Sequence, residues 1–299
     1  MCGIIGIASN KPVSMNIINS LKKLEYRGYD SAGLATLSNN LIDEKKCSGR
    51  VDELEKILFK HPSNGNIGIG HVRWATHGVP NIINAHPHSS EAVSVVHNGI
   101  IENSDELKKD LEAQGFKFKS QTDTEVITVL VTQFLQHAQP LDSVFKTLKK
   151  LKGSFALGII FKNFSDIIIG ARRGSPLAVG YSKDENYLGS DSYALKSMTN
   201  KISYLDDGEL CMLNKDNIEF YDVNQNKINK KIHTVSDDEN ISDKGDYKNF
   251  MSKEIFEQSN TIKKCISEYT DRLKKDINIY NFPIDPKKIK GQFCIRHYI

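Results

Sequence analysis

A cysteine stands where it could act as a nucleophile, because Cys2 follows the initiator methionine directly. A small second residue permits removal of that methionine, which leaves a thiol and a free α-amine on one residue. An α-amine has an ordinary pKa of about 7.7–8.0 and a thiol of about 8.5, so near neutral pH some of the amine can take the thiol proton. The alternative is a small apolar residue in a buried strand, the usual place of a free cysteine. Position alone favours that alternative.

Other polar residues could assist an attack on a carbonyl group. Asn98 and Gly99 follow an apolar run, and an amide side chain beside a glycine N–H can stabilise an oxyanion; the alternative is an ordinary Asn-Gly turn. Arg73 could grip a carboxylate with its planar guanidinium, or be a surface charge. Asp123 could bind a cation, or only place favourable charge in the first turn of a helix.

Histidines are concentrated in residues 69–102, which also hold the single tryptophan, Trp74. Five of the nine histidines lie there: His71, His77, His86, His88 and His97. A metal site is one interpretation, with His86 and His88 as ligands. No HExxH motif and no carboxylate at ligand spacing accompany them, so we expect no metal and interpret them as hydrogen-bonding groups that shape a pocket.

The elements that must position these residues are read from apolar periodicity. Strands are predicted at residues 2–8, 33–37, 67–72, 92–97, 154–161, 166–171, 177–180, 209–213 and 218–221, and helices at 14–26, 51–60, 104–114, 122–134, 141–152 and 191–198. Ser104 is the predicted N-cap of one helix, and Thr122–Glu125 form a capping-box pattern. Runs of strands with two groups of helices indicate an α+β protein rather than a Rossmann-type alternation.

Composition excludes several classes of protein. Of the 299 residues 39% are apolar and 26% charged, which suits a globular protein with a sizeable core. The net charge is only +3 and its basic excess lies after residue 262, so we expect no nucleic-acid partner. No apolar run reaches the ~18 residues of a membrane helix, and no secretory signal is evident, so we expect a cytoplasmic protein without membrane contact. Five scattered cysteines without a CxxC motif argue against a disulfide scaffold.

The chain changes character near residue 240. Residues 224–246 are polar and predicted to be an extended linker, and helical patterning returns over 250–275. We therefore predict two regions, 2–240 and 241–299. Without a partner, the helix around Ile262, Ile266 and Leu273 would expose an apolar stripe.

Six motifs occur in a fixed order along the chain. They are MCGIIGI at the N-terminus, LEYRGYDSAG at 24–33, HVRWATHG at 71–78, NAHPH at 84–88, VHNGIIEN at 96–103 and TDTEV at 122–126. In this order they resemble the class II glutamine amidotransferases, above all the glutaminase half of the members that make glucosamine 6-phosphate. The resemblance covers about the first 240 residues, and residues 244–258 are similar to the segment that leads into the sugar-isomerase half.

The resemblance implies an N-terminal-nucleophile hydrolase fold, a four-layer αββα sandwich with two antiparallel sheets between helices. It implies that Cys2 is the nucleophile, that its own amine is the base, and that Asn98 and Gly99 form the oxyanion hole. Attack on the glutamine side-chain amide would release ammonia and leave a γ-glutamyl thioester, which water cleaves to glutamate. No cofactor and no metal are implied.

The resemblance also assigns the binding of L-glutamine. Arg73 would hold the α-carboxylate and Asp123 the α-ammonium. Thr76 and His77 belong to the loop that covers the bound glutamine, and Trp74 on that loop resembles the residue that gates ammonia passage.

After Asp276 the chain departs from the family pattern. The expected first isomerase strand and its phosphate-binding turn do not follow, and Cys294 does not supply them. Three hypotheses follow: a glutaminase half, autonomous or completed by a separate isomerase polypeptide that supplies the fructose 6-phosphate site; a non-catalytic or uncoupled fragment of a decayed or split gene; and a module that binds glutamine for regulation. The complete set Cys2, Arg73, Asn98, Gly99 and Asp123 favours the first over the third.

Overall fold

The computed structural model describes residues 2–235, 247, 250–271 and 276–277. The chain divides into two compact units, Met1–Asn240 and Ile241–Ile299. All the residues that the sequence analysis singled out for chemistry lie in the first unit.

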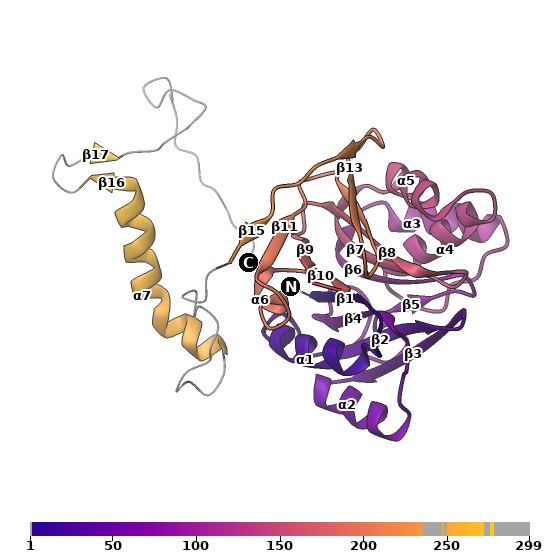
Figure 1. Ribbon diagram of the computed structural model, residues 1–299, viewed down its shortest axis with the longest axis horizontal. Helices are drawn as coiled ribbons and strands as arrows, with labels where there is room; N and C mark the ends of the chain where they lie inside the picture. Colours follow the sequence, from indigo (N-terminus) through magenta and orange to yellow (C-terminus); the bar gives the residue numbers. More distant parts are fainter. Residues whose placement is uncertain (1, 236–246, 248–249, 272–275, 278–299) are drawn as a thin grey trace. The chain divides into compact units, whose positions relative to one another are not determined.

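The first unit contains two antiparallel sheets (Figure 1). The first sheet has the order β15 (His233–Thr234), β11 (Lys201–Tyr204), β9 (Ala178–Tyr181), β10 (Glu185–Gly189), β1 (Gly3–Ser9), β4 (Ile67–Arg73), β2 (Ser31–Ser38) and β3 (Leu41–Ser48). The second has the order β14 (Lys227–Ile228), β13 (Ile218–Tyr221), β12 (Leu210–Leu213), β8 (Phe164–Arg173), β7 (Gly153–Phe161), β6 (Val93–Ile101) and β5 (His88–Ser89).

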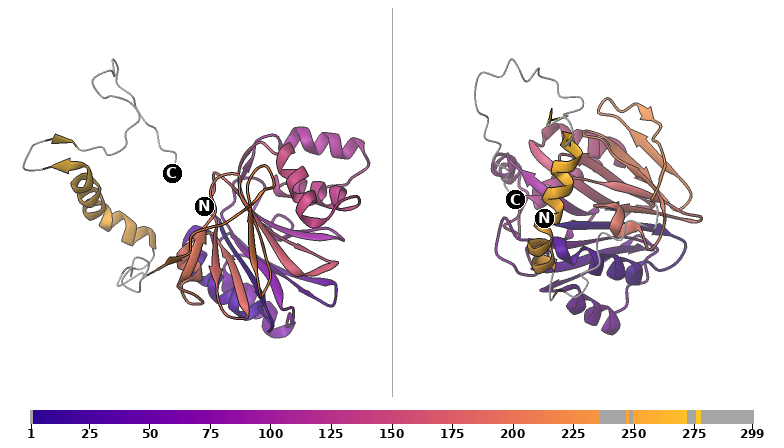
Figure 2. Two further views of the ribbon diagram at one scale, coloured as in Figure 1. Left: turned by 45° about the horizontal axis from the view of Figure 1, so that its top comes forward. Right: turned by 90° about the vertical axis from the view of Figure 1, so that its left-hand side faces the viewer.

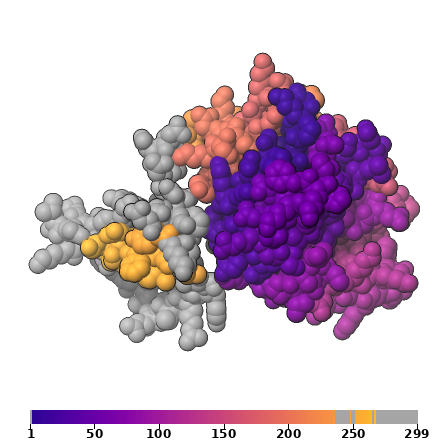
Figure 3. All heavy atoms as spheres, turned by 90° about the horizontal axis from the view of Figure 1, so that it is seen from below, coloured from indigo at the N-terminus to yellow at the C-terminus, as the bar shows by residue number. Residues whose placement is uncertain are grey.

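Helices cover the outer face of each sheet (Figures 1 and 2). The first sheet packs against α1 (Ser14–Leu24), α2 (Val51–Lys60) and the short α6 (Ser192–Leu195), with the 3₁₀ turn η1 (Glu25–Arg27) after α1. The second sheet packs against α3 (Ser104–Ala113), α4 (Thr124–Leu135) and α5 (Pro140–Lys150). The indigo and purple N-terminal residues form much of the face seen in Figure 3. The result is the predicted order helix, sheet, sheet, helix.

Strand β1 shows why this sequence makes a central strand. Successive side chains of a strand point to opposite faces. Ile4 and Ala8 therefore belong to the core between the two sheets, while Ile5 and Ile7 pack among residues of α1. Every residue of β1 is buried, as expected of a strand covered on both sides. This strand begins at Gly3, so it places Cys2 at its end.

Two predicted helix caps are wrong. At α4, Asp123 stands at the N-cap and no side chain caps the helix, so the expected capping box at Thr122 does not form. The Glu125 carboxylate instead accepts the backbone N–H groups of Lys119 and Ser120, at 2.9 and 2.6 Å. At α3, Ser104 is the first helical residue, and the N-cap is Asn103. The Glu125 carboxylate thus fixes the loop before α4, whereas the Asn103 side chain bonds to the backbone of Lys150 and Lys152.

The predicted linker over 224–246 is wrong in its first part. Residues 227–228 form β14 in the second sheet and residues 233–234 form β15 in the first, so the chain between them crosses from one sheet to the other. The remainder of that prediction, from 236 on, lies outside the described residues.

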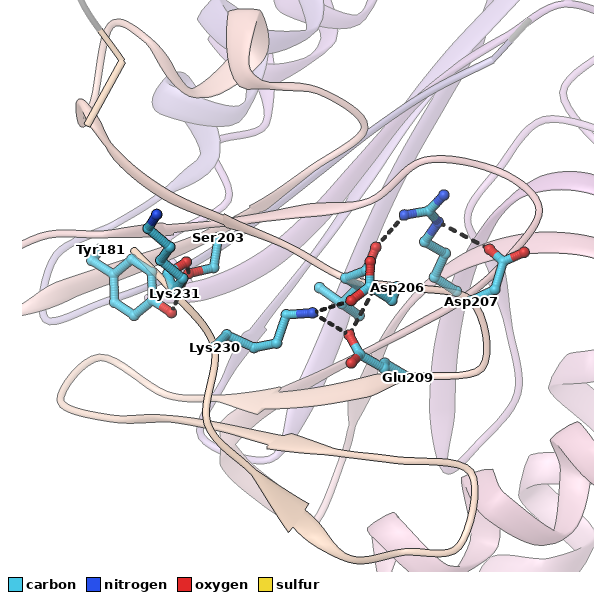
Figure 4. Close-up of polar contacts among 9 residues, drawn as sticks. Tyr181, Ser203, Asp206, Asp207, Glu209, Lys230 and Lys231 are labelled. Carbon is cyan, nitrogen blue, oxygen red and sulfur yellow. Dashed lines mark hydrogen bonds and ion pairs between the residues drawn. The ribbon is translucent and has the colours of Figure 1, made fainter. Parts of the chain in front are cut away.

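Polar contacts fasten this crossing segment (Figure 4). The Lys230 ammonium contacts Asp206 Oδ2 at 2.7 Å and Glu209 Oε2 at 2.8 Å. One residue on, the Lys231 carbonyl accepts the Ser203 hydroxyl at 2.8 Å, and Ser203 Oγ in turn accepts the Tyr181 hydroxyl at 2.9 Å. These contacts join the segment to β11 of the first sheet and to the loop that leads from β11 to β12.

The second unit contains α7 (Phe250–Tyr269), β16 (Thr270–Asp271) and β17 (Asp276–Ile277). On α7 the side chains of Met251, Ile255, Phe256, Ile262 and Ile266 are exposed. The exposed isoleucines agree with the predicted apolar stripe, whose third member, Leu273, lies outside the described residues. No helix in the described part of the chain is long and apolar enough to cross a membrane.

Candidate active site

The Cys2 thiol lies beside the end of β4. The Trp74 backbone N–H donates to Cys2 Sγ at 3.2 Å, and Sγ lies 3.5 Å from the Trp74 carbonyl oxygen. Burial raises the pKa of the Cys2 thiol above its ordinary value, and the backbone hydrogen bond from Trp74 opposes this only in part. The sulfur is therefore held as a thiol near neutral pH, and its use as a nucleophile requires a base.

Arg73 is the last residue of β4 and its side chain is buried. Its guanidinium donates to the carbonyl oxygens of His77 and Gly78, which fixes the turn after the strand. Among the described residues it has no carboxylate within ion-pair distance. Burial lowers the pKa of Arg73, while Cys2, Asp30 and Asp123 nearby favour the charged form. A buried cation without an anionic partner is suited to binding a carboxylate.

The residues after Arg73 form a largely exposed loop. Trp74, Thr76 and His77 are exposed, and the Trp74 ring meets Tyr29 edge-on with centroids 5.7 Å apart. Asp30 holds the base of the loop by accepting the Ala75 N–H at 2.8 Å. Gly28 allows this approach, because a Cβ there would lie 2.5 Å from the Arg73 carbonyl carbon. The loop is thus anchored at its base and exposed at its tip.

Asn98 and Gly99 lie on β6, at the inner face of the site. Asn98 Nδ2 donates to the Cys2 carbonyl at 3.0 Å and to Ser190 Oγ at 2.9 Å. Gly99 has a φ of +132°, and a Cβ there would lie 2.1 Å from the Ser154 carbonyl oxygen. Asn98 therefore adjoins Cys2, and both of its acceptors are protein atoms.

Asp123 precedes α4 and faces the same space. Its Oδ2 accepts the Ile101 backbone N–H at 2.8 Å, which ties the carboxylate to the end of β6. Asp123 and Arg73 both line the same pocket.

The buried histidines form a network around Thr124. Thr124 Oγ1 lies 2.8 Å from His86 Nε2 and 2.9 Å from His97 Nδ1, and Thr122 Oγ1 lies 2.9 Å from His88 Nε2. Burial lowers the pKa of His86, His88 and His97, so all three are neutral at pH 7. In the described part of the chain no three His, Cys, Asp or Glu side chains are grouped to hold a metal ion. The arrangement agrees with histidines that shape a pocket.

One small pocket joins these groups. Its lining residues are Cys2, Arg73, Trp74, Thr76, His77, His86, His97, Gly99, Thr122, Asp123 and Thr124. Its free volume is about 20 Å³, which is room for about one water molecule. Seven of the eight predicted site residues line it. The eighth, Asn98, is not in the lining but donates to the Cys2 carbonyl.

Sequence reasoning missed several residues of this site. His86 and His97 were among the histidines interpreted as hydrogen-bonding groups that shape a pocket, but their partners were not predicted. Thr122 and Thr124 belong to the TDTEV motif, although no contact with histidine followed from it. Ser190 follows an unpredicted strand and had no signal, and only the fold brings it to Asn98.

Comparison with known proteins agrees with this geometry. Residues 82–197 match the family described as "Glutamine amidotransferase domain". The chain is 44% identical over 296 residues to the glutamine–fructose-6-phosphate aminotransferase (isomerizing) of Mesorhizobium japonicum, covering 99% of this chain and 49% of that protein. It is 46% identical over 272 residues to the enzyme of the same name from Brucella abortus, covering 91% and 45%. The chain spans about half the length of the curated relatives it matches.

A solved structure shares the architecture. Glutamine phosphoribosylpyrophosphate amidotransferase from B. subtilis, complexed with ADP and GMP, superposes with a TM-score of 0.66 at 26% identity, covering 76% of this chain and 50% of that one.

Proposed function

We propose that this chain, which belongs to the glutamine amidotransferase family and has its N-terminal-nucleophile hydrolase fold, cleaves the side-chain amide of L-glutamine with the Cys2 thiol. The observation that carries the proposal is one pocket lined by Cys2, the unpaired Arg73 cation and the Asp123 carboxylate. A pocket that holds a thiol, a cation and an anion suits an amino acid that presents both charges at one end and a carbonyl at the other.

Proton transfer is the first requirement, because the Cys2 thiol has a raised pKa. Once Met1 has been removed, the α-amine of Cys2 takes the thiol proton, and Sγ forms a bond to the δ-carbon of glutamine. The resulting ammonium returns that proton to the leaving nitrogen as the C–N bond breaks, which releases ammonia. Water then cleaves the γ-glutamyl thioester, giving glutamate and restoring the thiol.

Charge orients the substrate in this proposal. Arg73 binds the α-carboxylate of glutamine and Asp123 binds its α-ammonium. The Trp74 N–H, which donates to Sγ, stabilises the thiolate as the proton leaves. The same backbone position that shapes the loop thus contributes to activation of the nucleophile.

The tetrahedral intermediate needs oxyanion donors, and we assign these to Asn98 and Gly99. Because Asn98 Nδ2 already donates to the Cys2 carbonyl and to Ser190, the oxyanion must share or replace one of those bonds. The Cys2 carbonyl bond is the one to be replaced, since it lies at the reacting residue.

Admission of glutamine requires movement, since the pocket holds about one water molecule. The loop that carries Trp74, Thr76 and His77 is the exposed wall of the pocket, and we propose that it opens for glutamine and closes over it. Trp74 then governs the exit of ammonia.

The destination of the ammonia is proposed from the relatives, whose name includes fructose 6-phosphate. We propose that a separate isomerase polypeptide supplies the sugar-phosphate site, since the name of the relatives also includes the word isomerizing. The free cysteines Cys2, Cys47 and Cys211 suit a reducing compartment, and we propose the cytoplasm. The second candidate is a glutaminase that is uncoupled from synthesis, and the observation that favours it is a pocket whose lining lies wholly within the first unit.

The test is glutamate release from glutamine by Met1-free chain, with and without fructose 6-phosphate. We expect release from the wild type, none from a folded Cys2→Ala variant, and almost none from Cys2→Ser. Full activity in Cys2→Ala, or in a preparation whose intact mass retains Met1, contradicts the proposed role of Cys2. Release that ignores the sugar phosphate supports the uncoupled glutaminase.

A further inference from the structure

His71 is a buried residue of β4 that lies outside the pocket. Its Nε2 is 3.0 Å from the His97 carbonyl oxygen and 3.1 Å from Asn98 Oδ1. A carbonyl oxygen can only accept, so Nε2 must carry a hydrogen. The tautomer of His71 is therefore set by its neighbours.

A separate contact shows which end of the Asn98 amide is the nitrogen and which is the oxygen. Its nitrogen faces the Cys2 carbonyl, another group that only accepts, so nitrogen and oxygen cannot be exchanged. The second acceptor of the nitrogen, Ser190 Oγ, also accepts the Ile4 backbone N–H at 2.7 Å. The oxygen of the amide is left to face His71.

The other ring nitrogen of His71 cannot take a proton at low cost. Within the described part of the chain Nδ1 is buried and has no hydrogen-bond partner. The ring stacks on His86, with centroids 4.2 Å apart and an interplanar angle of 29°. Burial lowers the pKa of His71 to about 3. His71 therefore stays a neutral Nε2–H donor throughout the physiological range.

We propose that His71 is a positioning residue for the proposed glutaminase reaction: its Nε2–H holds the Asn98 amide with the nitrogen toward Cys2, where the oxyanion forms. This inference rests on the proposed function. If the amide turned over, Oδ1 would face the Cys2 carbonyl and the developing negative charge, and a donor would become a repulsive acceptor. His71 acts through Asn98 and touches no substrate atom.

A double-mutant cycle tests this coupling. Removing an oxyanion donor costs about 10²–10³ in kcat, so we expect His71→Leu to lower kcat by about 10–100-fold with little change in KM. In an Asn98→Ala background the same change should cost less than about 3-fold. His71→Gln, whose amide N–H can replace Nε2–H, should restore most of the lost kcat. Equal costs of His71→Leu in both backgrounds overturn the proposal.

The matched control is His88→Leu. His88 is also buried and belongs to the same group of rings, but its Nε2 contacts Thr122 and not Asn98. We expect its effect on kcat to be the same in the wild-type and Asn98→Ala backgrounds. Coupling of His88 to Asn98 as strong as that of His71 would show a general effect of disrupting the core, and would also overturn the proposal.

A second measurement does not depend on turnover. Long-range ¹H–¹⁵N NMR of the ¹⁵N-histidine-labelled wild type should show His71 with a protonated Nε2 and an unprotonated Nδ1 between about pH 5.5 and 8. A protonated Nδ1 contradicts the proposal even if the enzyme is active. If the wild type releases no glutamate, the proposed function fails, and the NMR result still decides whether His71 orients Asn98.

Discussion

Gly99 is the residue whose backbone the site constrains most. Its φ of +132° is a conformation that side chains rarely adopt, and a Cβ would meet the Ser154 carbonyl oxygen of β7 at 2.1 Å. The close approach of β6 to β7 thus depends on the missing side chain. The same residue is a proposed oxyanion donor, so stability and catalysis depend on one backbone position.

Substituting Gly99→Ala should therefore destabilise the protein by more than the ~1–3 kcal/mol of backbone strain alone, and should lower kcat for glutamate release. The physical reason is that β6 and β7 must move apart to admit the methyl group. Urea denaturation and steady-state kinetics on the same preparation measure the two effects.

Gly115→Ala is the control. Gly115 has a φ of +91°, but a Cβ there would have no neighbour within 4 Å. It should cost the strain alone and leave kcat unchanged. Equal losses of stability at the two positions would show that the contact with Ser154 is unimportant.

At the scale of the elements, the segment between β14 and β15 connects the second sheet to the first. Lys230 and Glu209 each have only 13% of their side chains exposed, so this ion pair is better shielded than most in the protein. Shielded, charged hydrogen bonds contribute more than surface pairs, typically about 1.5–3 kcal/mol. We therefore expect the Lys230–Glu209 pair to contribute more to the free energy of unfolding than an exposed ion pair does.

Lys230→Met should lower the free energy of unfolding by roughly 1–3 kcal/mol, because it leaves Glu209 without its cation. Lys227→Met is the comparison: Lys227 pairs with Glu219, but its side chain is 61% exposed, so the expected cost is below about 1 kcal/mol. Chemical denaturation of the two variants measures the free energy of unfolding that each one loses. Equal costs would mean that the crossing segment contributes no more than an exposed pair.

At the scale of the whole molecule, four buried neutral imidazoles make stability depend on pH. His71, His86, His88 and His97 all have lowered pKa values in the folded state, that of His71 falling to about 3. In the unfolded chain a histidine titrates near 6.5. Below that pH the unfolded state binds more protons, so the free energy of unfolding falls as the pH drops.

We expect a loss of up to about 1.4 kcal/mol per pH unit for each histidine below pH 6.5, and little pH dependence from this source above it. Urea denaturation at pH 7.5, 6.5 and 5.5 measures the slope. His88→Gln should reduce it by about one proton. A wild-type stability that is flat from pH 6.5 to 5.5 contradicts this.

Much of the fold was predictable from local patterns. The apolar run at the N-terminus predicts β1, and the helical periodicities predict α1, α2 and α5, because these elements bury a face with a regular period. Strand β3 was missed because Asp43, Glu44, Lys45 and Lys46 give an edge strand without an apolar alternation. Strands β10 and β11 were missed as short segments that only pairing with distant strands stabilises.

The site likewise contains residues that the sequence predicts and contacts that it does not. The candidate residues are recognisable in sequence through the six ordered motifs that carry the family resemblance, because a cysteine, an arginine and an Asn-Gly pair each have an ordinary structural alternative when taken alone. The contacts of Ser190 with Asn98 and Ile4 span 92 and 186 residues of chain, and no local pattern encodes them. The bonds of Thr124 with His86 and His97 are likewise products of the fold.

The Asn98 amide has a consequence beyond orientation. It comes from β6 of one sheet, and its partners come from the other: His71 in β4, Cys2 before β1 and Ser190 after β10. The alignment of the proposed reactive centre therefore depends on how the two sheets pack against each other. A small shift between the sheets would misalign the proposed oxyanion donor, Asn98, and the proposed nucleophile, Cys2, while every strand remains intact. The packing of intersheet side chains outside the pocket, such as Ile160 and Leu188, therefore affects the alignment of the site.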